Sequence, residues 1–212
     1  MLELGVLISG RGSNLQAILD AVADGRLPAR VKLVIANKAK AGGLERAEAA
    51  GVPTQVISHR AHESREAFDA ALVAALREAG VEWVVLAGFM RVVTPVFLDA
   101  FPGRVVNIHP SLLPAFPGID AQAQAIDYGV RVSGCTVHLV NAGVDAGPIL
   151  AQAVVPVEEG DDADRLAARI LDKEHALLVA TLRWIAEGRL QIEAGSGERP
   201  RVTFRGVTPL LS

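Results

Sequence analysis

Two polar side chains interrupt an apolar run that has the length of a buried strand, in the stretch G-R-V-V-N-I-H-P-S at Gly103–Ser111. Residues two apart on a strand point the same way, so Asn107 and His109 share one face. Pro110 has no N–H to give to a ladder and ends the pairing. A lone histidine here is most simply a satisfied, partly buried strand cap. Asn107 beside it favours catalysis, because two converging donors can hold a developing oxyanion.

A carboxylate follows later in the chain, in the loop N-A-G-V-D-A-G. Asn, Gly and Asp are common turn residues, so a solvated loop is one interpretation. The other is that Asp145 pairs with His109 and favours the charged form of the imidazole. Asn107, His109 and Asp145 would then bring an amide donor, a titratable base and a carboxylate to one site.

A glycine-rich loop, S-G-R-G-S-N-L at Ser9–Leu15, separates the first expected strand from the first expected helix. Gly10 and Gly12 allow the backbone to bend and approach a ligand, and the start of a helix attracts an anion. Leu15 stands where a dinucleotide fingerprint needs its third glycine, and the loop lacks the G-K-[ST] of a Walker A motif. Either an ordinary turn or a phosphate site fits this pattern.

A long helix is expected at Asp162–Glu187, and its apolar stripe is interrupted by Glu174. His175 breaks the neighbouring row of apolar residues. Both side chains can lie wet at the edge of the stripe, or the Glu174 carboxylate can reach into a ligand cleft.

Strands and helices alternate through the first half of the chain, which predicts an α/β fold with a Rossmann-like, open, mostly parallel twisted sheet and helices on both faces. Expected strands after Val105–His109 indicate a mixed or antiparallel C-terminal part. We expect a single domain over residues 1–195 and a polar tail over 196–212, with a short strand at Val202–Phe204. The remaining expected elements are strands at Leu2–Ser9, Val31–Ala36, Thr54–Ile57, Val84–Ala87, Gly134–Val140 and Ile149–Val157, and helices after Gly12, at Leu44–Ala50 and at Glu63–Ala79.

The composition restricts the class of partner. The chain of 212 residues has a formal net charge of −3 and a pI near 6.0, so no broad basic face is expected for nucleic acid. A single cysteine, Cys135, fits a reducing compartment. The start has no basic leader or cleavage site, and no apolar run reaches the ~18 residues of a membrane span. We expect a cytoplasmic protein that binds small molecules, with no metal, no nucleic acid and no membrane.

The motifs also carry a resemblance that runs from Gly5 to about Leu190. The chain resembles the phosphoribosylglycinamide formyltransferases, a folate-dependent formyltransferase family of purine synthesis. The N-I-H-P-S-L-L-P motif with a later D-x-G is shared by formyl-folate transferases and hydrolases, and S-G-R-G-S-N-L is the more selective piece. The other shared pieces are S-R-E-A-F-D, V-V-L-A-G-F-M-R, G-C-T-V-H-L-V, V-D-A-G-P-I-L-A-Q and K-E-H.

The resemblance implies roles for particular residues. It implies transfer of the formyl group of 10-formyltetrahydrofolate, a co-substrate, to the amine of glycinamide ribonucleotide through a tetrahedral intermediate. Asn107, His109 and Asp145 would be catalytic, and the Leu113–Pro114 bond would be cis. Gly12, Ser13 and Asn14 would hold the phosphate and Glu174 the ribose hydroxyls. Folate would be bound by Arg65, Met90, Arg91, Val92, Val93, Asn107, Asn141, Val144 and Asp145.

Two alternatives remain at this point. A formyltetrahydrofolate hydrolase or another formyl-folate transferase, such as a methionyl-tRNA formyltransferase, shares the motif around Asn107–Pro114. A non-catalytic nucleotide- or folate-binding module has no need of the catalytic trio. We expect the chain to act as a monomer or a homodimer.

Overall fold

The structure is a computed structural model that describes residues 1–193 and 200–211. The chain divides into two compact units, Met1–Asn107 and Ile108–Ser212. The division falls within one strand, β5 (Val105–His109). The expectation of a single domain over residues 1–195 stays a prediction.

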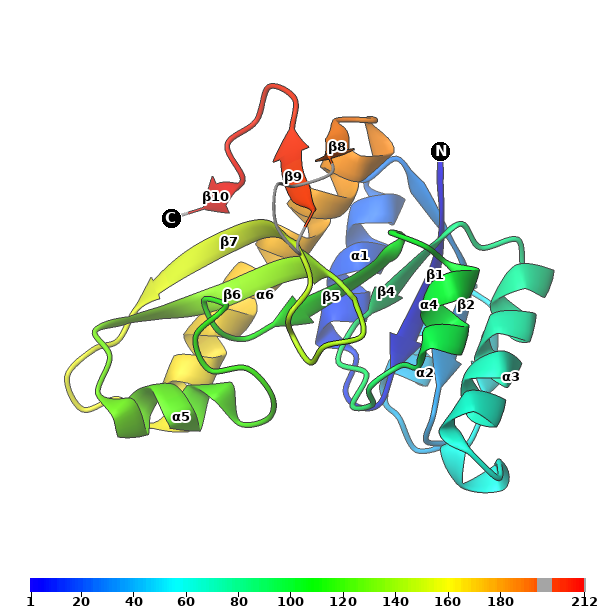
Figure 1. The fold of residues 1–212 in the computed structure, drawn as a ribbon, viewed down its shortest axis with the longest axis horizontal. Helices are drawn as coiled ribbons and strands as arrows, with labels where there is room; N and C mark the ends of the chain where they lie inside the picture. Colours follow the sequence, from blue (N-terminus) through cyan, green and yellow to red (C-terminus); the bar gives the residue numbers. More distant parts are fainter. Residues whose placement is uncertain (194–199, 212) are drawn as a thin grey trace. The chain divides into compact units, whose positions relative to one another are not determined.

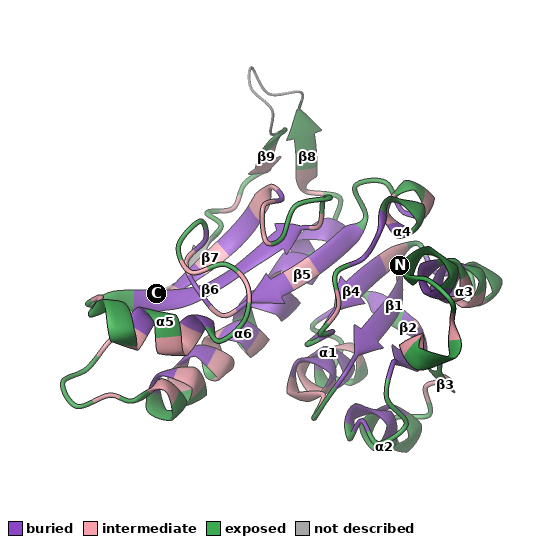
Figure 2. Cartoon of the chain, turned by 60° about the horizontal axis from the view of Figure 1, so that its bottom comes forward, coloured by how far each residue is buried: buried purple, intermediate pink, exposed green. Residues whose placement is uncertain are grey.

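The first unit is built on a parallel sheet. Its strands lie in the order β5-β4-β1-β2-β3, and each neighbouring pair is parallel. Figure 2 shows this sheet between two pairs of helices, α1 with α2 and α3 with α4. The strands are β1 (Leu2–Ile8), β2 (Ala29–Ala36), β3 (Thr54–Val56) and β4 (Trp83–Leu86), and the helices are α1 (Ser13–Ala23), α2 (Gly43–Ala49), η1 (His59–Ala61), α3 (Arg65–Glu78) and α4 (Pro95–Ala100). The predicted α/β class with an open, mostly parallel sheet is confirmed.

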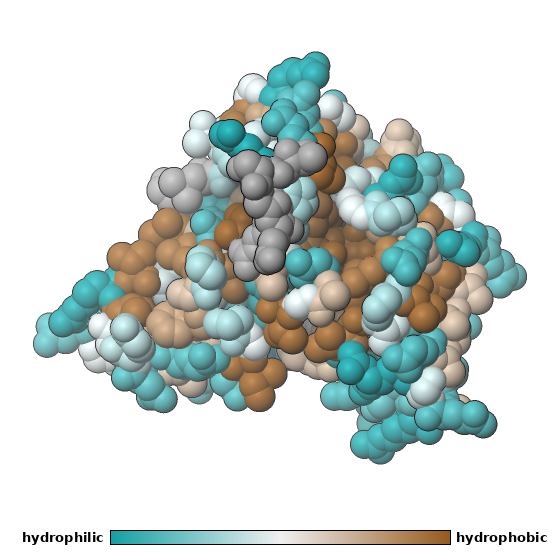
Figure 3. Space-filling view, viewed as in Figure 1, coloured by the Kyte–Doolittle hydropathy of each residue, from teal (hydrophilic) through white to brown (hydrophobic). Residues whose placement is uncertain are grey.

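The central strands of this unit carry nearly continuous apolar runs because helices cover both faces of their sheet. In β1, Leu4, Val6, Leu7 and Ile8 are all fully buried. Hydrophilic side chains instead gather around the amino end of α3, as Figure 3 shows. Parallel pairing brings the carboxyl ends of the strands to one edge, which is where ligands bind in open α/β sheets.

The second unit is mixed, as the sequence predicts. Strands β6 (Val132–Leu139) and β7 (Ile149–Pro156) pair antiparallel, and β10 (Leu210–Leu211) adds a parallel partner to β7. The long helix α6 (Ala163–Ala186) packs against both β6 and β7. The short helix α5 (Ala121–Tyr128) lies below β6 in Figure 1.

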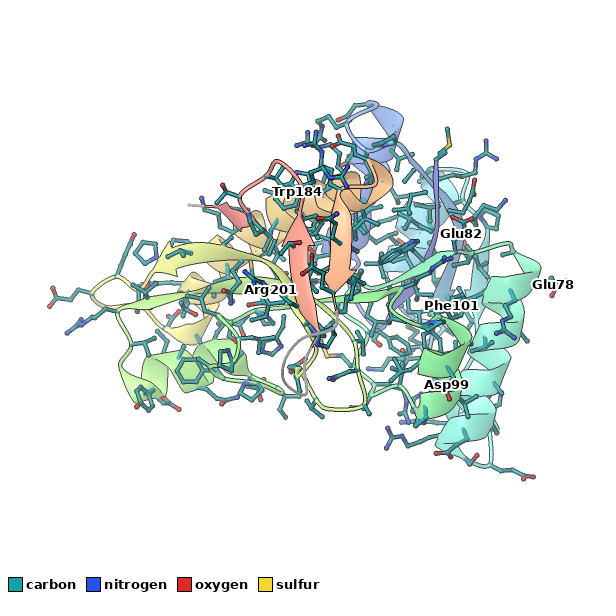
Figure 4. The ribbon with its side chains drawn as sticks, turned by 45° about the horizontal axis from the view of Figure 1, so that its top comes forward. Glu78, Glu82, Asp99, Phe101, Trp184 and Arg201 are labelled. Carbon is teal, nitrogen blue, oxygen red and sulfur yellow. The ribbon has the colours of Figure 1, made fainter. Side chains whose placement is uncertain are left out.

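The C-terminal segment adds a small hairpin. Strands β8 (Leu190–Glu193) and β9 (Arg201–Phe204) pair antiparallel, which confirms the strand expected at Val202–Phe204. Trp184, labelled in Figure 4 at the last turn of α6, packs its ring 5.4 Å from that of Phe204. Residues 196–199 and 212 of the expected polar tail lie outside the described residues, as do 194 and 195 before it.

Within the described ranges, no helix is both long enough and apolar enough to cross a membrane.

Candidate active site

His109 is the last residue of β5 and is only 4% exposed. Asn107, which precedes it by two residues on the same strand, is half-buried. The flanking Val105, Val106 and Ile108 are buried. The prediction that a buried strand ends in these two polar side chains is confirmed.

The contacts of His109 determine where its protons lie. Its Nε2 is 2.8 Å from the carbonyl oxygen of Phe116, and a carbonyl only accepts, so Nε2 carries a proton. Its Nδ1 is 3.3 Å from Oδ2 of Asp145. A neutral ring has one N–H, so only the imidazolium donates to both partners at once. The geometry therefore places the Nδ1 of His109 against the carboxylate of Asp145.

Asp145 lies between two histidines. Besides His109, its Oδ1 is 3.6 Å from Nε2 of His138, and its Oδ2 accepts a hydrogen bond of 2.8 Å from the Gly118 N–H. Burial by itself raises the pKa of this carboxyl. The His138 ring, the Gly118 N–H and the charge of His109 outweigh burial and hold the pKa below its ordinary value. Asp145 is therefore an anion at neutral pH, as the pairing with His109 requires.

His138 belongs to this site and was not predicted from the sequence. It lies on β6, is 2% exposed, and its Nδ1 is 3.0 Å from the Leu139 carbonyl oxygen. The signal that could have found it is the same one that identified His109, an imidazole within a buried strand, here in G-C-T-V-H-L-V.

The backbone between His109 and Gly118 is fixed by side chains and by an uncommon conformation. The Leu113–Pro114 bond is cis, as predicted, and Phe116 has a φ of 52°. The Thr136 hydroxyl donates to the Ser111 carbonyl over 2.7 Å and accepts from the Leu113 N–H over 3.0 Å. Left-handed φ values are sparse for residues other than glycine and cluster at functional sites. Asp145, with a φ of 48°, is another example.

Hydrogen bonds from α2 hold the glycine-rich loop of the first unit in place. Gly12 has a φ of 74° and precedes the first residue of α1, Ser13. The Gly43 N–H donates to the Gly10 carbonyl over 3.1 Å, and Arg46 Nε donates to the Arg11 carbonyl over 2.9 Å. A Cβ on Gly12 would lie 2.5 Å from the Gly43 Cα. The loop is thus a close backbone turn whose N–H groups open a helix, the arrangement that attracts a phosphate.

The residues expected to bind folate lie in both units. In the first, Arg65 Nη2 donates to the Val92 carbonyl over 2.9 Å, and the Arg91 guanidinium lies 5.6 Å from the Phe68 ring centroid. Met90 and Val92 are 72% and 47% exposed, whereas Val93 is buried. In the second unit, Val144 is 54% exposed and Asn141 is also exposed.

Glu174 is buried on α6, at 7% exposure, so the interpretation that it lies wet at the edge of the stripe is wrong. Burial, and secondarily the charge of Glu174, raises the pKa of the Cys135 thiol to about 12. The neighbouring His175 is half-buried, and burial lowers its pKa despite the nearby Asp172. Within residues 1–193 and 200–211, no group of three or more His, Cys, Asp or Glu side chains is arranged to hold a metal ion.

A buried imidazole paired with a carboxylate, at the carboxyl end of a strand in an α/β fold, fits acyl-transfer chemistry. The family model described as formyl transferase matches residues 3–182, and the chain belongs to this family. It is 44% identical to phosphoribosylglycinamide formyltransferase of Escherichia coli over 90% of both chains.

Solved structures agree with this comparison. Glycinamide ribonucleotide transformylase 1 from Symbiobacterium toebii superposes with a TM-score of 0.91 at 56% identity, covering 95% of this chain and 94% of that one. The chain is also 46% identical to the human trifunctional purine biosynthetic protein adenosine-3, covering 90% of this chain. It spans 19% of the length of that human protein and 14% of the relative from Drosophila pseudoobscura pseudoobscura.

Proposed function

We propose that this chain is a phosphoribosylglycinamide formyltransferase. It transfers the formyl group of 10-formyltetrahydrofolate to the amine of N1-(5-phospho-D-ribosyl)glycinamide and so serves purine synthesis. The observation that carries the proposal is the contact of 3.3 Å between His109 and Asp145, in a chain that matches the Escherichia coli enzyme over 90% of both lengths. The products are formylglycinamide ribonucleotide and tetrahydrofolate.

His109 and Asn107 act on the formyl oxygen. When the substrate amine attacks the formyl carbon, negative charge develops on that oxygen, and the amide of Asn107 and the imidazolium of His109 donate to it. The His109 Nε2–H donates to the Phe116 carbonyl in the structure. If this N–H is the donor, the formyl oxygen must replace that carbonyl as its acceptor during the reaction.

Asp145 keeps His109 charged and takes part in moving the proton. The amine nitrogen first bonds to the formyl carbon and gives a tetrahedral intermediate, which collapses as the bond from that carbon to folate N10 breaks, and one proton passes from the attacking nitrogen to N10. A carboxylate with a depressed pKa stabilises the imidazolium throughout, and it assists that proton transfer through water. His138, on the far oxygen of the same carboxylate, holds it in orientation.

Other residues bind and position the substrates. Gly12, Ser13 and Asn14 hold the 5′-phosphate at the start of α1, and Glu174 takes the ribose hydroxyls. In the first unit, Arg65 and the segment from Met90 through Arg91 and Val92 to Val93 contact the folate. Asn107, Asn141, Val144 and Asp145 complete the folate contacts.

The test measures tetrahydrofolate release by purified protein with and without the ribonucleotide. Turnover that depends on glycinamide ribonucleotide and yields the formylated product supports the proposal. Equal turnover without the amine would identify a hydrolase, and formylation of methionyl-tRNA would identify a different transferase. The variant Asp145→Asn serves as the control, because it abolishes the charge that holds His109 and should be nearly inactive in the same assay.

A further inference from the structure

The motif S-R-E-A-F-D, at Ser64–Asp69, supplies Arg65 to the proposed folate contacts but leaves its last residue without a role. Asp69 lies on α3 and is only 2% exposed. Its Oδ2 accepts a hydrogen bond of 2.5 Å from the Thr94 N–H. A carboxylate is rarely buried to this extent unless it is paired, because burial removes its hydration. The burial of Asp69 therefore indicates a specific role at Thr94.

Thr94 directly follows the residues proposed to contact folate, Met90–Val93, which we call the folate segment. This segment lies in neither a helix nor a strand. Within the described part of the chain, no backbone–backbone hydrogen bond holds Phe89–Val93. A backbone without such bonds opens easily, so the shape of the folate segment depends on side chains from other elements.

Side chains bind the backbone at both ends of the folate segment. At its amino end, the Ser9 hydroxyl accepts a hydrogen bond of 2.9 Å from the Met90 N–H. Just past its carboxyl end, the Asp69 carboxylate accepts from the Thr94 N–H. Hydrogen bonds to a charged acceptor are shorter and roughly twice as strong as those to a neutral one. Asp69 therefore makes the stronger of these two contacts.

Other residues on the same face of α3 also contact the folate segment. The spacing of Arg65, Phe68 and Asp69 places all three on one side of the helix. Arg65 Nη2 donates to the Val92 carbonyl oxygen over 2.9 Å. The Arg91 guanidinium lies 5.6 Å from the centroid of the Phe68 ring. One face of α3 thus contacts the folate segment along most of its length.

The hydrogen bond from Thr94 also lies at the start of α4. Thr94 is the N-cap residue of that helix, but its own hydroxyl makes no capping bond and has no hydrogen-bond partner among the described residues. If Asp69 only supported α4, its loss would lower the stability of the fold without weakening one substrate in particular. The two roles therefore differ in their effect on folate binding.

We propose that Asp69 is a positioning residue for folate, which holds the Thr94 N–H and so fixes the backbone of the folate segment in the conformation that receives the folate. The inference rests on the proposed function, from which it takes the folate contacts of Met90–Val93. A segment that is ordered in advance loses less freedom when its ligand binds, so Asp69 strengthens folate binding without touching the folate. The ribonucleotide is unaffected, because its proposed phosphate contacts lie at the start of α1.

Titration calorimetry on the full chain measures Kd for tetrahydrofolate and for glycinamide ribonucleotide separately. Asp69→Ala should raise Kd for tetrahydrofolate roughly tenfold, on the scale of one hydrogen bond to a charged group, and leave Kd for the ribonucleotide unchanged. Asp69→Asn keeps an acceptor oxygen but loses the charge, so the increase should be about threefold. Thr94→Val replaces the unpaired hydroxyl and keeps the N–H, so both Kd values should match those of the wild type.

Val73→Ala is the control for a loss of stability alone. Val73 is buried on the next turn of α3 and lies beside Val96 and Ala100 of α4. Its truncation weakens the packing between these helices, so Tm should fall while Kd for tetrahydrofolate stays at the wild-type value. Equal increases of that Kd in Val73→Ala and Asp69→Ala would show that Asp69 acts only through the stability of the fold, and would overturn the inference.

Amide hydrogen exchange in the free protein adds a measurement that needs no substrate. Exchange of the Thr94 amide should be several-fold faster in Asp69→Ala and Asp69→Asn than in the wild type, and unchanged in Val73→Ala. Exchange at the wild-type rate in both Asp69 variants would show that the carboxylate does not hold this part of the backbone, and would overturn the inference.

The binding measurements distinguish failure of this inference from failure of the proposed function. A wild-type chain that does not bind tetrahydrofolate would refute the proposed function and the inference with it. Wild-type binding of both substrates, with an unchanged Kd for tetrahydrofolate in Asp69→Asn, would overturn the role of Asp69 alone. Equal increases for the two substrates in Asp69→Ala would do the same. If Asp69→Ala does not fold, Asp69→Asn still decides between these outcomes.

Discussion

Three glycine-to-alanine variants separate the two energetic costs of substituting Gly12 in the glycine-rich loop, which are backbone strain and a steric clash. Gly12 has a φ of 74°, and a Cβ there would lie 2.5 Å from the Gly43 Cα, a backbone atom. Gly80, at the end of α3, shares the left-handed φ, at 71°, but has open space around an added Cβ. Gly10 has open space and no left-handed φ. The series therefore adds backbone strain at Gly80, and both strain and a backbone clash at Gly12.

The magnitudes follow from these environments. A left-handed backbone costs an alanine about 1–2 kcal/mol, and forcing an extra carbon into a filled space costs about 1–3 kcal/mol. Gly12→Ala should therefore lose about 2–5 kcal/mol and Gly80→Ala about 1–2 kcal/mol. In a chain of this size 1 kcal/mol corresponds to roughly 2–4 °C in Tm. Gly10→Ala should leave Tm unchanged or slightly raised, because alanine restricts the unfolded chain.

Thermal unfolding followed by circular dichroism measures the order of the three variants. On the proposed function, Gly12→Ala should also raise KM for the ribonucleotide several-fold more than KM for formyl folate, since displacement of the loop moves the N–H groups that hold the phosphate. If Tm fell no further for Gly12→Ala than for Gly80→Ala, the close approach of Gly12 to α2 would be wrong. Equal increases in both KM values would contradict the assignment of the loop to the phosphate.

The other predictions concern the buried ionisable groups. Asp145→Asn keeps an oxygen for the Gly118 N–H but removes the charge, so kcat should fall about 10²-fold or more with an unchanged circular dichroism spectrum. The pKa of Asp145 is lower in the folded protein than the ordinary Asp value near 4, so ionised Asp145 stabilises the fold at pH values above that ordinary pKa. This stabilisation is lost as the pH falls through the pKa that Asp145 has in the folded protein. Urea unfolding should therefore show the stability advantage of the wild type over Asp145→Asn shrinking between about pH 5 and pH 2. The Cys135 thiol, with a pKa of about 12, should resist iodoacetamide at pH 8 in the native protein and react in urea.

Each of these has a contrary result. A near-normal kcat in Asp145→Asn would show that the carboxylate takes no part in the mechanism. A stability advantage of the wild type that does not change with pH would show that the partners of Asp145 do not lower its pKa. Rapid alkylation of native Cys135 would show that β6 opens readily.

The strands and the long helix were predictable because their apolar patterns are strong. The residues Val105–His109 form β5 as expected, and the helix expected at Asp162–Glu187 is α6, which those two residues flank. The short helices α4 and α5 were not predicted. α5 has the sequence A-Q-A-Q-A-I-D-Y and buries only Ala121 and Ala125, so it shows no apolar stripe that a period can detect.

The pairing of His109 with Asp145 was predictable as chemistry, whereas its geometry was not. The residue types indicate an acid and a base. The position of Asp145, however, depends on a left-handed backbone, and its approach to His138 depends on how the loop folds beside β6, and an apolar pattern specifies neither. The alternation argument that singled out His109 applies equally to His138, which lies within a buried strand. The polar Thr136, two residues before His138 on β6, repeats the spacing of Asn107 and His109, so the sequence pattern pointed to His138 as well.

The carboxylate of Asp145 lies between two imidazoles that make similar contacts. Each ring gives one nitrogen to a carbonyl oxygen, that of Phe116 for His109 and that of Leu139 for His138. The other nitrogen of each ring then faces Asp145, at 3.3 and 3.6 Å. The carboxylate only accepts, and the His138 ring, the Gly118 N–H and the charge of His109 together hold its pKa below the ordinary value, so an anion faces both rings. Asp145 itself has a φ of 48°, a left-handed conformation that is sparse outside glycine and recurs at functional sites.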